Sequence, residues 1–208
     1  VLDIEQPDAD LLVSAQTGSG KTLAFGLSIA TTLLQEDTEF SRPKLPVALI
    51  IAPTRELALQ VRKELEWVYA RTKAQFASCV GGMDPRAERR TLENGAHIVV
   101  GTPGRLRDHI ERGALRLSDI KAVVLDEADE MLDMGFREDL TFILEKSPVS
   151  RRTLLFSATV PKQIAKMART YQKEAIRISV SSEKKQHLDI SYHAMKIQPS
   201  DRDKAIIN

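Results

Sequence analysis

Residues 11–22 read LLVSAQTGSGKT, and this stretch decides the fold. It opens with an apolar, strand-like run, and a candidate helix follows near residues 20–35. In the loop between them, Gly18 and Gly20 permit positive φ angles, so that consecutive N–H groups and the helix N-terminus converge on an anion. Strand, glycine-rich loop and helix in this order predict a phosphate-binding loop in an α/β domain.

The residues of this loop have distinct predicted roles. Lys21 would reach the β- and γ-phosphates of a nucleotide, and the Thr22 hydroxyl would bind Mg²⁺. Ala15 occupies the first position, where the general pattern GxxxxGK[ST] has glycine. This difference indicates a narrower class of phosphate-binding loops than the general pattern describes. An ordinary glycine-rich turn with a surface lysine is the alternative, which the strand-loop-helix context disfavours. The predicted nucleotide-binding residues are Ala15, Gln16, Thr17, Gly18, Ser19, Gly20, Lys21 and Thr22.

Apolar runs alternate with stretches of helical spacing along the rest of the chain. Most of these runs are apolar on both faces, as the strands of a parallel sheet covered by helices on both sides must be. The sequence therefore predicts a three-layer α/β/α P-loop domain with a mostly parallel central sheet. Residues 36–46 hold two prolines and several charges, which predicts a surface loop. The expected strands are 11–15, 47–52, 76–80, 97–100, 121–126, 153–157 and, more weakly, 175–180.

The run 121–129 (KAVVLDEAD) delivers Asp126 and Glu127 at the carboxyl end of an apolar strand, which is the edge where parallel α/β sheets bind ligands. Asp126 is suited to holding Mg²⁺, directly or through water. Glu127 is suited to orienting and deprotonating an attacking water. Taken alone, these carboxylates are equally well explained as a solvated acidic helix start. Residues 126–145 hold eight acids and one base, and most of these acids are expected at the surface.

Composition argues against several other classes of protein. The chain has 208 residues, of which 42% are hydrophobic and 28% charged, as expected for one folded domain with or without an appendage. Its apolar runs are far shorter than the roughly 20 residues of a membrane span. The acidic start of the chain argues against a signal peptide, and the single Cys79 excludes an internal disulfide, so a cytoplasmic location is expected. The histidines show no metal-ligand spacing, so no zinc site is expected.

Several short motifs follow one another in a fixed order along the chain. They are AQTGSGKT at 15–22, PTRELALQ at 53–60, the pair Gly81–Gly82, TPGR at 102–105, DEAD at 126–129 and SAT at 157–159. With these motifs, the chain resembles the DEAD-box RNA helicases over roughly residues 10–180, the first of that family's two RecA-like domains. The alanine that opens the phosphate loop is that family's own form.

The resemblance implies ATP and Mg²⁺ as cofactors and sets out a nucleotide site. The implied catalytic residues are Glu127, Asp126 and Lys21, with Thr22 and Asp126 on the metal. Asp129 would contact the segment Ser157, Ala158 and Thr159, through Ser157 or Thr159, and so couple the ATP state to RNA binding. A helix N-cap before Pro161 is an alternative reading of this segment and is compatible with that contact.

The resemblance also implies RNA as a partner, bound without sequence preference. Small residues let backbone amides approach phosphates, arginines supply bidentate contacts, and helix starts point positive dipole ends at the strand. Residues 81–116 carry seven arginines against five acids, which is weak evidence by itself. The implied RNA-binding residues are Pro53, Thr54, Arg55, Gly81, Gly82, Thr102, Pro103, Gly104 and Arg105, whereas Arg86, Arg89, Arg90 and Arg107 are expected at the surface.

The resemblance also divides the chain. Residues 1–180 are expected to form the ATP-binding domain, and residues 181–208 a linker and the start of a second RecA-like domain. Gln6 lies too near the loop to be the family's adenine-recognition glutamine, so that motif is expected to be missing. The second domain would supply arginine fingers in cis, so the chain alone is expected to bind nucleotide weakly and to hydrolyse ATP slowly.

The intact protein is thus expected to hydrolyse ATP with RNA bound and to unwind RNA duplexes locally or remodel RNA–protein complexes. Three alternatives stay open. A DNA-directed superfamily 2 ATPase is disfavoured by the loop form together with DEAD. A non-enzymatic RNA-binding scaffold is disfavoured because Lys21, Thr22, Asp126 and Glu127 are intact. A small-molecule kinase accounts for none of PTREL, TPGR and SAT.

Overall fold

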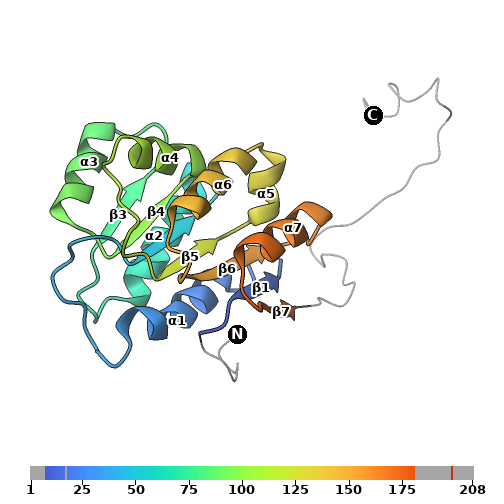
Figure 1. Ribbon diagram of the computed structural model, residues 1–208, viewed down its shortest axis with the longest axis horizontal. Helices are drawn as coiled ribbons and strands as arrows, with labels where there is room; N and C mark the ends of the chain where they lie inside the picture. The colour runs from blue at the N-terminus through green and yellow to red at the C-terminus, as the bar shows by residue number, and fades with distance from the viewer. Residues whose placement is uncertain (1–7, 17, 181–197, 199–208) are drawn as a thin grey trace.

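The structure is a computed structural model that describes residues 8–16, 18–180 and 198. Strands and helices alternate through this part of the chain (Figure 1). The strands are β1 (Leu11–Ser14), β2 (Ala48–Ile51), β3 (Phe76–Cys79), β4 (Ile98–Gly101), β5 (Ala122–Leu125), β6 (Arg152–Ser157) and β7 (Ile176–Ser179). The helices are α1 (Lys21–Leu34), α2 (Arg55–Val68), α3 (Pro85–Asn94), α4 (Pro103–Glu111), α5 (Ala128–Asp133), α6 (Arg137–Lys146) and α7 (Lys162–Tyr171).

All seven predicted strands are confirmed, each within one residue of the expected bounds. They form one sheet in the order β3-β4-β2-β5-β6-β1-β7. The predicted parallel sheet is confirmed, and every strand pair in the described part is parallel. The physical reason is that at least one helix follows each strand before the next begins, so each connection is a crossover that returns to the same end of the sheet.

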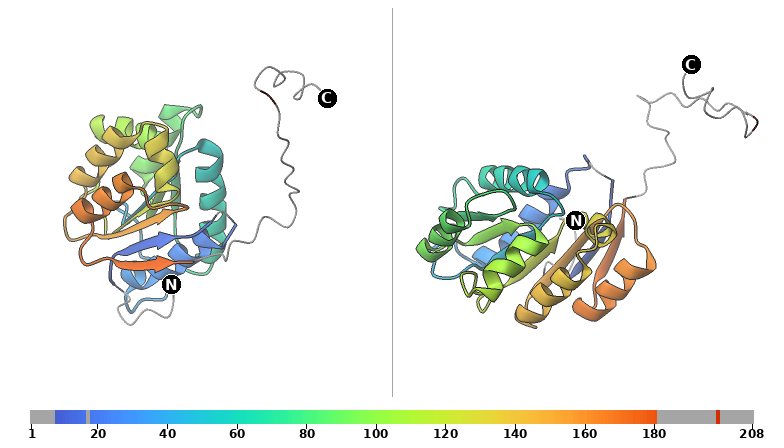
Figure 2. Two further views of the ribbon diagram at one scale, coloured as in Figure 1. Left: turned by 90° about the vertical axis from the view of Figure 1, so that its right-hand side faces the viewer. Right: turned by 90° about the horizontal axis from the view of Figure 1, so that it is seen from above.

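Helices cover both faces of the sheet and make the three predicted layers (Figure 2). Side chains alternate along each strand, so Ala48 and Ile50 face α1 and α2 while Leu49 and Ile51 face the other helices. On the α1 and α2 side, Phe25 packs edge-on against Phe156 of β6, with ring centroids 5.4 Å apart. Both faces are therefore closed to water, which explains why the strands are apolar on both sides.

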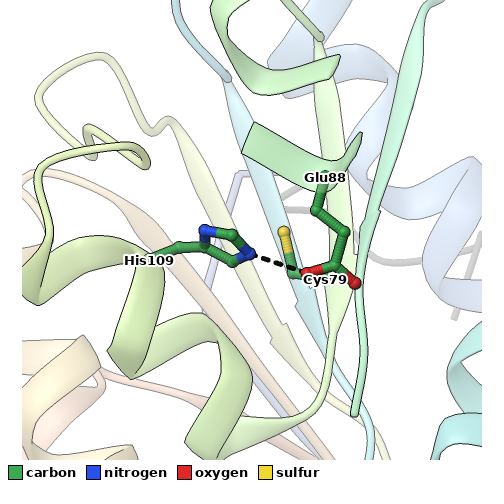
Figure 3. Close-up of side chains that lie close together, drawn as sticks. All are labelled: Cys79, Glu88 and His109. Carbon is green, nitrogen blue, oxygen red and sulfur yellow. Dashed lines mark hydrogen bonds and ion pairs between the residues drawn. The ribbon is translucent and has the colours of Figure 1, made fainter. Parts of the chain in front are cut away.

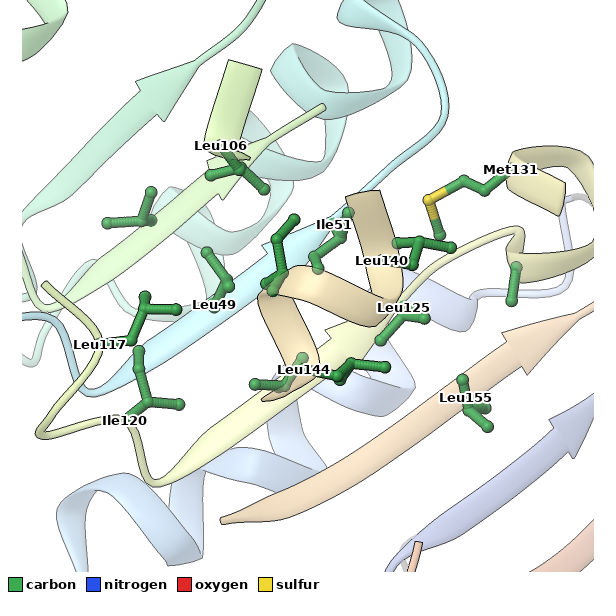
Figure 4. Close-up of a cluster of buried hydrophobic side chains, with 14 of the residues drawn as sticks. Leu49, Ile51, Leu106, Leu117, Ile120, Leu125, Met131, Leu140, Leu144 and Leu155 are labelled. Atoms are coloured by element: carbon green, nitrogen blue, oxygen red, sulfur yellow. The ribbon is translucent and has the colours of Figure 1, made fainter. Parts of the chain in front are cut away.

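The larger core cluster lies beneath α4 to α7 (Figure 4). Leu106, Met131, Leu140 and Leu144 from these helices are fully buried against the sheet, where they meet strand residues such as Leu125. This packing fixes the start of α4 and of α5 against the strand ends. Both helix starts carry residues of the predicted site, so the core determines where those residues lie.

Residues 36–46 form the connection between α1 and β2 without regular structure, as predicted. The segment is anchored, because the Phe40 ring stacks on the buried His97 ring with centroids 4.5 Å apart. Apart from residue 198, the linker and the second-domain start expected at residues 181–208 lie outside the described residues. Within the described part of the chain, no helix has the length and apolar character needed to cross a membrane.

The strand order has a direct consequence for the site. Because the strands are parallel, the loops that follow them all emerge at one edge of the sheet. The loops after β3, β4 and β2 are neighbours, and those after β5, β6 and β1 are neighbours. We call the first set the β2–β3–β4 loops and the second set the β1–β5–β6 loops. The predicted RNA-binding motifs all lie in the first set and the predicted nucleotide motifs all lie in the second.

Candidate functional site

The loop between β1 and α1 has the backbone of an anion cradle. Gly18 and Gly20 adopt positive φ angles of 75° and 77°, and Gly20 is the N-cap of α1. An added Cβ at either glycine would meet nothing within 4 Å, so the left-handed backbone, and not crowding, requires glycine there. Lys21 is only 8% exposed, and its Nζ donates to the Ala15 carbonyl oxygen at 3.4 Å. Thr17 lies outside the described residues.

The end of β5 places two carboxylates beside this loop. Asp126 is 2% exposed, and its Oδ1 atom has no hydrogen-bond partner in the described structure. The pKa of Asp126 is raised to about 6, chiefly by burial; the nearby Lys21 ammonium lowers it and the Glu127 carboxylate raises it. A buried carboxylate oxygen without a protein partner beside a lysine fits a cation bound together with a nucleotide.

Glu127 has a strained backbone. Its φ angle is +53°, in the left-handed region that glutamate rarely adopts. This conformation lets the chain turn directly from β5 into α5, with Glu127 as the N-cap residue. The Glu127 Oε1 atom lies 4.0 Å from Lys21 Nζ. Strain of this kind persists only where the surrounding structure enforces it, and it is concentrated at functional sites.

The loop after β6 contacts the acidic loop. Asp129 Oδ2 accepts hydrogen bonds from the Thr159 N–H at 2.9 Å and the Thr159 hydroxyl at 2.8 Å. Burial raises the pKa of Asp129, but the nearby Ser157 hydroxyl and the Thr159 hydrogen bonds outweigh burial, so the pKa lies below its ordinary value. The N-cap reading of this segment is wrong, because Pro161 itself caps α7 without a side-chain hydrogen bond. The structure thus selects Thr159 as the residue that Asp129 binds.

In the β2–β3–β4 loops, two arginines hold one glycine turn. Arg55 Nη1 donates to the Gly81 carbonyl at 3.4 Å, and Arg105 Nη2 donates to the Met83 carbonyl at 3.1 Å. Gly82 has a φ angle of 76°, and an added Cβ there would lie 2.7 Å from Arg55 Nη1. The motifs PTREL, GG and TPGR are therefore in mutual contact, although they are separated in the sequence.

Two helices begin at this edge and point their amide ends outward. The Thr54 hydroxyl accepts from the Leu57 N–H at 3.2 Å and so caps α2. Thr102 is the N-cap of α4 but makes no side-chain cap hydrogen bond, and Pro103 is the first residue of that helix. The exposed Gly104 adds no side chain to cover the amides. The first turn of α4 therefore offers backbone N–H groups to an anion.

Four arginines were expected at the surface. Arg86, Arg89 and Arg90 are exposed, but Arg107 is partly buried and pairs with Glu111 at 2.8 Å and Asp139 at 3.1 Å. Hydrogen bonds from its guanidinium to these two carboxylates raise the pKa of Arg107. Arg107 is therefore a link between α4 and α6 and not an unpartnered surface residue.

Two buried polar residues stand out in the structure but not in the sequence. Glu88 is the buried residue of the polar helix α3, and His109 is buried on α4. Their side chains are hydrogen-bonded, with His109 Nε2 2.7 Å from Glu88 Oε2. No local pattern marks Glu88, because its neighbours Arg89 and Arg90 are also charged and α3 has few apolar residues.

Together, the parallel sheet, the glycine loop before α1 and the buried acid after β5 define a P-loop domain of the RecA-like class. Residues 2–167 match the family model described as "DEAD/DEAH box helicase". The chain belongs to this family. It is 44% identical over 173 residues to the DEAD-box ATP-dependent RNA helicase CshA of Geobacillus kaustophilus, and this match covers 83% of the chain and 36% of that protein.

Other relatives agree in family and fold. The chain is 42% identical over 189 residues to DEAD-box ATP-dependent RNA helicase 9 of Oryza sativa subsp. japonica, covering 90% of the chain and 30% of the relative. A DEAD box protein of Methanococcus jannaschii superposes with a TM-score of 0.76 at 39% identity, covering 83% of this chain and 46% of that one. The yeast DEAD-box splicing factor Prp28 superposes with a TM-score of 0.78 at 35% identity, covering 88% of this chain and 44% of that one. The chain spans about a third of the length of these curated relatives.

Proposed function

We propose that this chain is the first RecA-like domain of an RNA-dependent ATPase that unwinds RNA duplexes locally or remodels RNA–protein complexes. One observation carries the proposal: the strand order gathers the nucleotide motifs after β1, β5 and β6 and the RNA motifs after β2, β3 and β4 along one sheet edge. The names of the relatives, ATP-dependent RNA helicases, support it. Nucleotide and RNA would then bind side by side on the same rigid edge.

In the β1–β5–β6 loops, residues 15–22 would surround the phosphates with backbone amides, and Lys21 would bind the β- and γ-phosphates. Thr22 and Asp126 are the residues suited to Mg²⁺, since the Asp126 Oδ1 atom is buried and has no hydrogen-bond partner in the described structure. When bound, Mg²⁺ would neutralise charge on the phosphate oxygens. These are the residues that the chain offers to ATP.

Glu127 would act as the general base of hydrolysis. In the free chain, its Oε1 atom faces Lys21 Nζ at 4.0 Å, and Lys21 also donates to the Ala15 carbonyl. A phosphate offers Lys21 a stronger, fully charged partner. Once Lys21 turns to the phosphate, the Glu127 carboxylate is free to orient a water and accept its proton.

In the β2–β3–β4 loops, the contacts proposed for RNA are the backbone of the glycine turn, the N-termini of α2 and α4, and the side chains of Arg55 and Arg105. These groups bind phosphate and sugar oxygens and do not read base edges. Binding would therefore be independent of sequence. The hydrogen bonds between Asp129 and Thr159 join the start of α5 to the loop after β6, both within the β1–β5–β6 set. Through this contact they would help to couple the ATP state to RNA binding.

We further propose that residues 1–180 form this domain and that residues 181–208 lead into a second RecA-like domain. A second domain in cis would complete the RNA groove and supply arginine fingers. Without an arginine finger, phosphoryl transfer is slower by about 10³ to 10⁵ in comparable systems. The 208-residue chain alone is therefore expected to hydrolyse ATP slowly.

The test is ATP turnover by the full-length protein with no nucleic acid, with single-stranded RNA and with DNA of the same sequence. RNA alone should stimulate turnover, and Glu127→Gln should lower it by about 10² or more. The matched control is Glu130→Gln, an exposed acid in the same helix start. Equal stimulation by DNA would favour a DNA-directed ATPase, and RNA binding without turnover would favour a scaffold.

A further inference from the structure

The buried carboxylate of Glu88 joins the glycine turn to the helix that carries TPGR. Glu88 lies one turn into α3, and its Oε1 atom accepts a hydrogen bond from the Val80 N–H at 2.9 Å. Its Oε2 atom lies 2.7 Å from His109 Nε2, which donates to it because a carboxylate oxygen only accepts (Figure 3). Both oxygens are thus used, and three segments meet at one side chain.

The same carboxylate faces the arginine of TPGR. Arg105 Nε lies 3.5 Å from Glu88 Oε2, and the Arg105 side chain is 17% exposed. The Arg105 guanidinium also donates to the carbonyls of Val80 at 3.4 Å and Met83 at 3.1 Å, on either side of the glycine pair. Glu88 therefore holds the amide of Val80, while Arg105 holds the carbonyl of the same residue.

These residues also include the one potential metal cluster among the described residues, formed by Cys79, Glu88 and His109, whose ligand atoms lie within 4.8 Å of one another. Three observations argue against a bound metal. Burial raises the pKa of the Cys79 thiol, and the Glu88 charge raises it further, so the thiolate that metals require is disfavoured. Both Glu88 oxygens already accept hydrogen bonds, and Arg105 brings a positive charge to the same place. The cluster is better explained by hydrogen bonding.

We propose that Glu88 is a positioning residue for RNA binding, which sets the Gly81–Gly82 turn and the Arg105 guanidinium in the geometry that receives the RNA backbone. This inference rests on the proposed function of those loops. Glu88 is 4% exposed and so does not itself reach RNA. It acts through Val80 and Arg105, and His109 fixes the second oxygen from α4.

The chemistry predicts which replacements are tolerated. Glu88→Met keeps the length of the side chain but removes both carboxylate oxygens, so the Val80 N–H and His109 lose their hydrogen-bond partner and Arg105 loses the charge that it faces. Glu88→Gln keeps one acceptor for the Val80 N–H, and its NH₂ group can donate to His109 if the imidazole changes tautomer. The glutamine variant should therefore restore most of what the methionine variant loses, with only the charge opposite Arg105 missing.

The experiment measures binding of a labelled oligouridylate and RNA-stimulated ATP turnover by the full-length protein. Glu88→Met is expected to weaken RNA binding and raise the half-saturating RNA concentration by about tenfold or more, the effect of losing one charge-assisted hydrogen bond. Turnover at saturating RNA and the affinity for ATP should stay unchanged. Glu88→Gln should lie within about threefold of the wild type, since the hydrogen bonds are kept. Thermal unfolding identifies variants that do not fold.

The matched control is Glu93→Met, on the exposed side of the same helix, where Glu93 pairs with Arg89. If Glu88→Met does not fold, Glu88→Asp replaces it, because it keeps the charge but withdraws the carboxylate by one methylene, and a threefold or larger loss is expected. Wild-type RNA affinity in a folded Met or Asp variant overturns the inference. An unmodified protein that does not bind RNA instead overturns the proposed function.

Discussion

Asp129 and Thr159 are joined by two hydrogen bonds to a single carboxylate oxygen, at 2.9 Å from the Thr159 N–H and 2.8 Å from its hydroxyl. Asp129 lies in the first turn of α5, directly after β5, and Thr159 lies in the loop after the neighbouring strand β6. The loop after β6 also contacts β1, because the Ser14 hydroxyl donates to the Ala158 carbonyl at 3.3 Å. A movement of Asp129 would therefore displace the loop after β6 and, through the Ser14 hydrogen bond, act on β1, the strand that leads into the phosphate-binding loop.

The Thr159 hydroxyl should matter more for coupling than for binding. Thr159→Val keeps the N–H and the shape but loses the hydroxyl hydrogen bond to a charged group, worth about 1.5 to 3 kcal/mol. In the full-length protein, ATP affinity should stay within about twofold while duplex unwinding per ATP falls about tenfold. The control is Thr170→Val, an exposed threonine whose hydroxyl donates only to the local Lys166 carbonyl. Unwinding per ATP equal to the wild type would refute the coupling role.

Asp126 should destabilise the nucleotide-free chain at neutral pH. Burial raises its pKa from 3.8 to about 6, so folding favours its protonated form. The corresponding stability is present below the ordinary pKa and is lost as the pH rises through about 6. Asp126→Asn is therefore expected to raise the free energy of unfolding at pH 7.5, by at most about 3 kcal/mol, and to have little effect near pH 4.

Urea unfolding at the two pH values measures this effect, with Asp133→Asn, an exposed acid on α5, as the control. The same Asp126→Asn variant should lose Mg²⁺-dependent nucleotide binding. A lower stability than the wild type at pH 7.5 would show that the Asp126 charge is stabilised in the free chain. It would then contradict the reading of the partnerless oxygen as a site kept for a cation.

The sequence predicted the strands, and the positions of the glycine loop after β1 and of the acidic residues after β5, because both depend on local features. Runs such as 47–52 and 121–126 are apolar on both faces, and the glycines and Lys21 have fixed spacing within one loop. The order of the strands was not predicted, because it depends on packing between distant segments. Only that order shows that the two sets of motifs occupy separate halves of the edge.

Buried polar contacts between distant residues could not be predicted from the sequence either. Arg152 donates to the Ala9 carbonyl at 2.7 Å and to the Ser28 carbonyl at 2.7 Å, and Asp10 accepts from the Thr153 N–H at 2.7 Å. In the sequence these are ordinary charged residues near strand starts. Glu88 is likewise a charged residue whose buried partners, Val80 and His109, belong to other segments of the chain, here at the opposite edge of the sheet. A charge is expected at the surface unless a specific partner is known, and the partner is known only from the fold.

His97 should make the chain sensitive to acid. Its Nδ1 atom accepts the Gln75 N–H at 2.9 Å, so the neutral ring carries its hydrogen on Nε2, 2.7 Å from the Ser41 carbonyl. Burial lowers the pKa of His97, although the Ser41 carbonyl partly opposes this. Because the folded-state pKa is depressed, the stability is present above the ordinary pKa of 6.5 and is lost as the pH falls through the lower folded value.

His97→Phe keeps a ring to stack on Phe40 but cannot titrate. The variant should be less stable than the wild type at pH 7.5, since it loses both hydrogen bonds, and the difference should shrink as the pH falls below 6. Chemical denaturation at a series of pH values gives the two curves. Curves that stay parallel across this range would show that His97 does not titrate on unfolding.

Gly82 and Gly113 offer a matched pair that separates backbone strain from the shape of the RNA site. Their φ angles are 76° and 71°, so Ala should cost about 1 to 2 kcal/mol at each position. An added Cβ at Gly113 meets nothing within 4 Å, whereas at Gly82 it lies 2.7 Å from Arg55 Nη1. Gly82→Ala must therefore displace the guanidinium that holds the Gly81 carbonyl.

Both variants are expected to lose similar stability in urea unfolding, but only Gly82→Ala should weaken binding of a labelled oligouridylate, by about tenfold, because one arginine contact is worth about 1.5 to 3 kcal/mol. ATP binding should be unaffected in both, since the β1–β5–β6 loops are untouched. A comparable loss of RNA affinity in Gly113→Ala would mean that general destabilisation causes the effect. Unchanged RNA affinity in Gly82→Ala would remove the glycine turn from the RNA-binding surface.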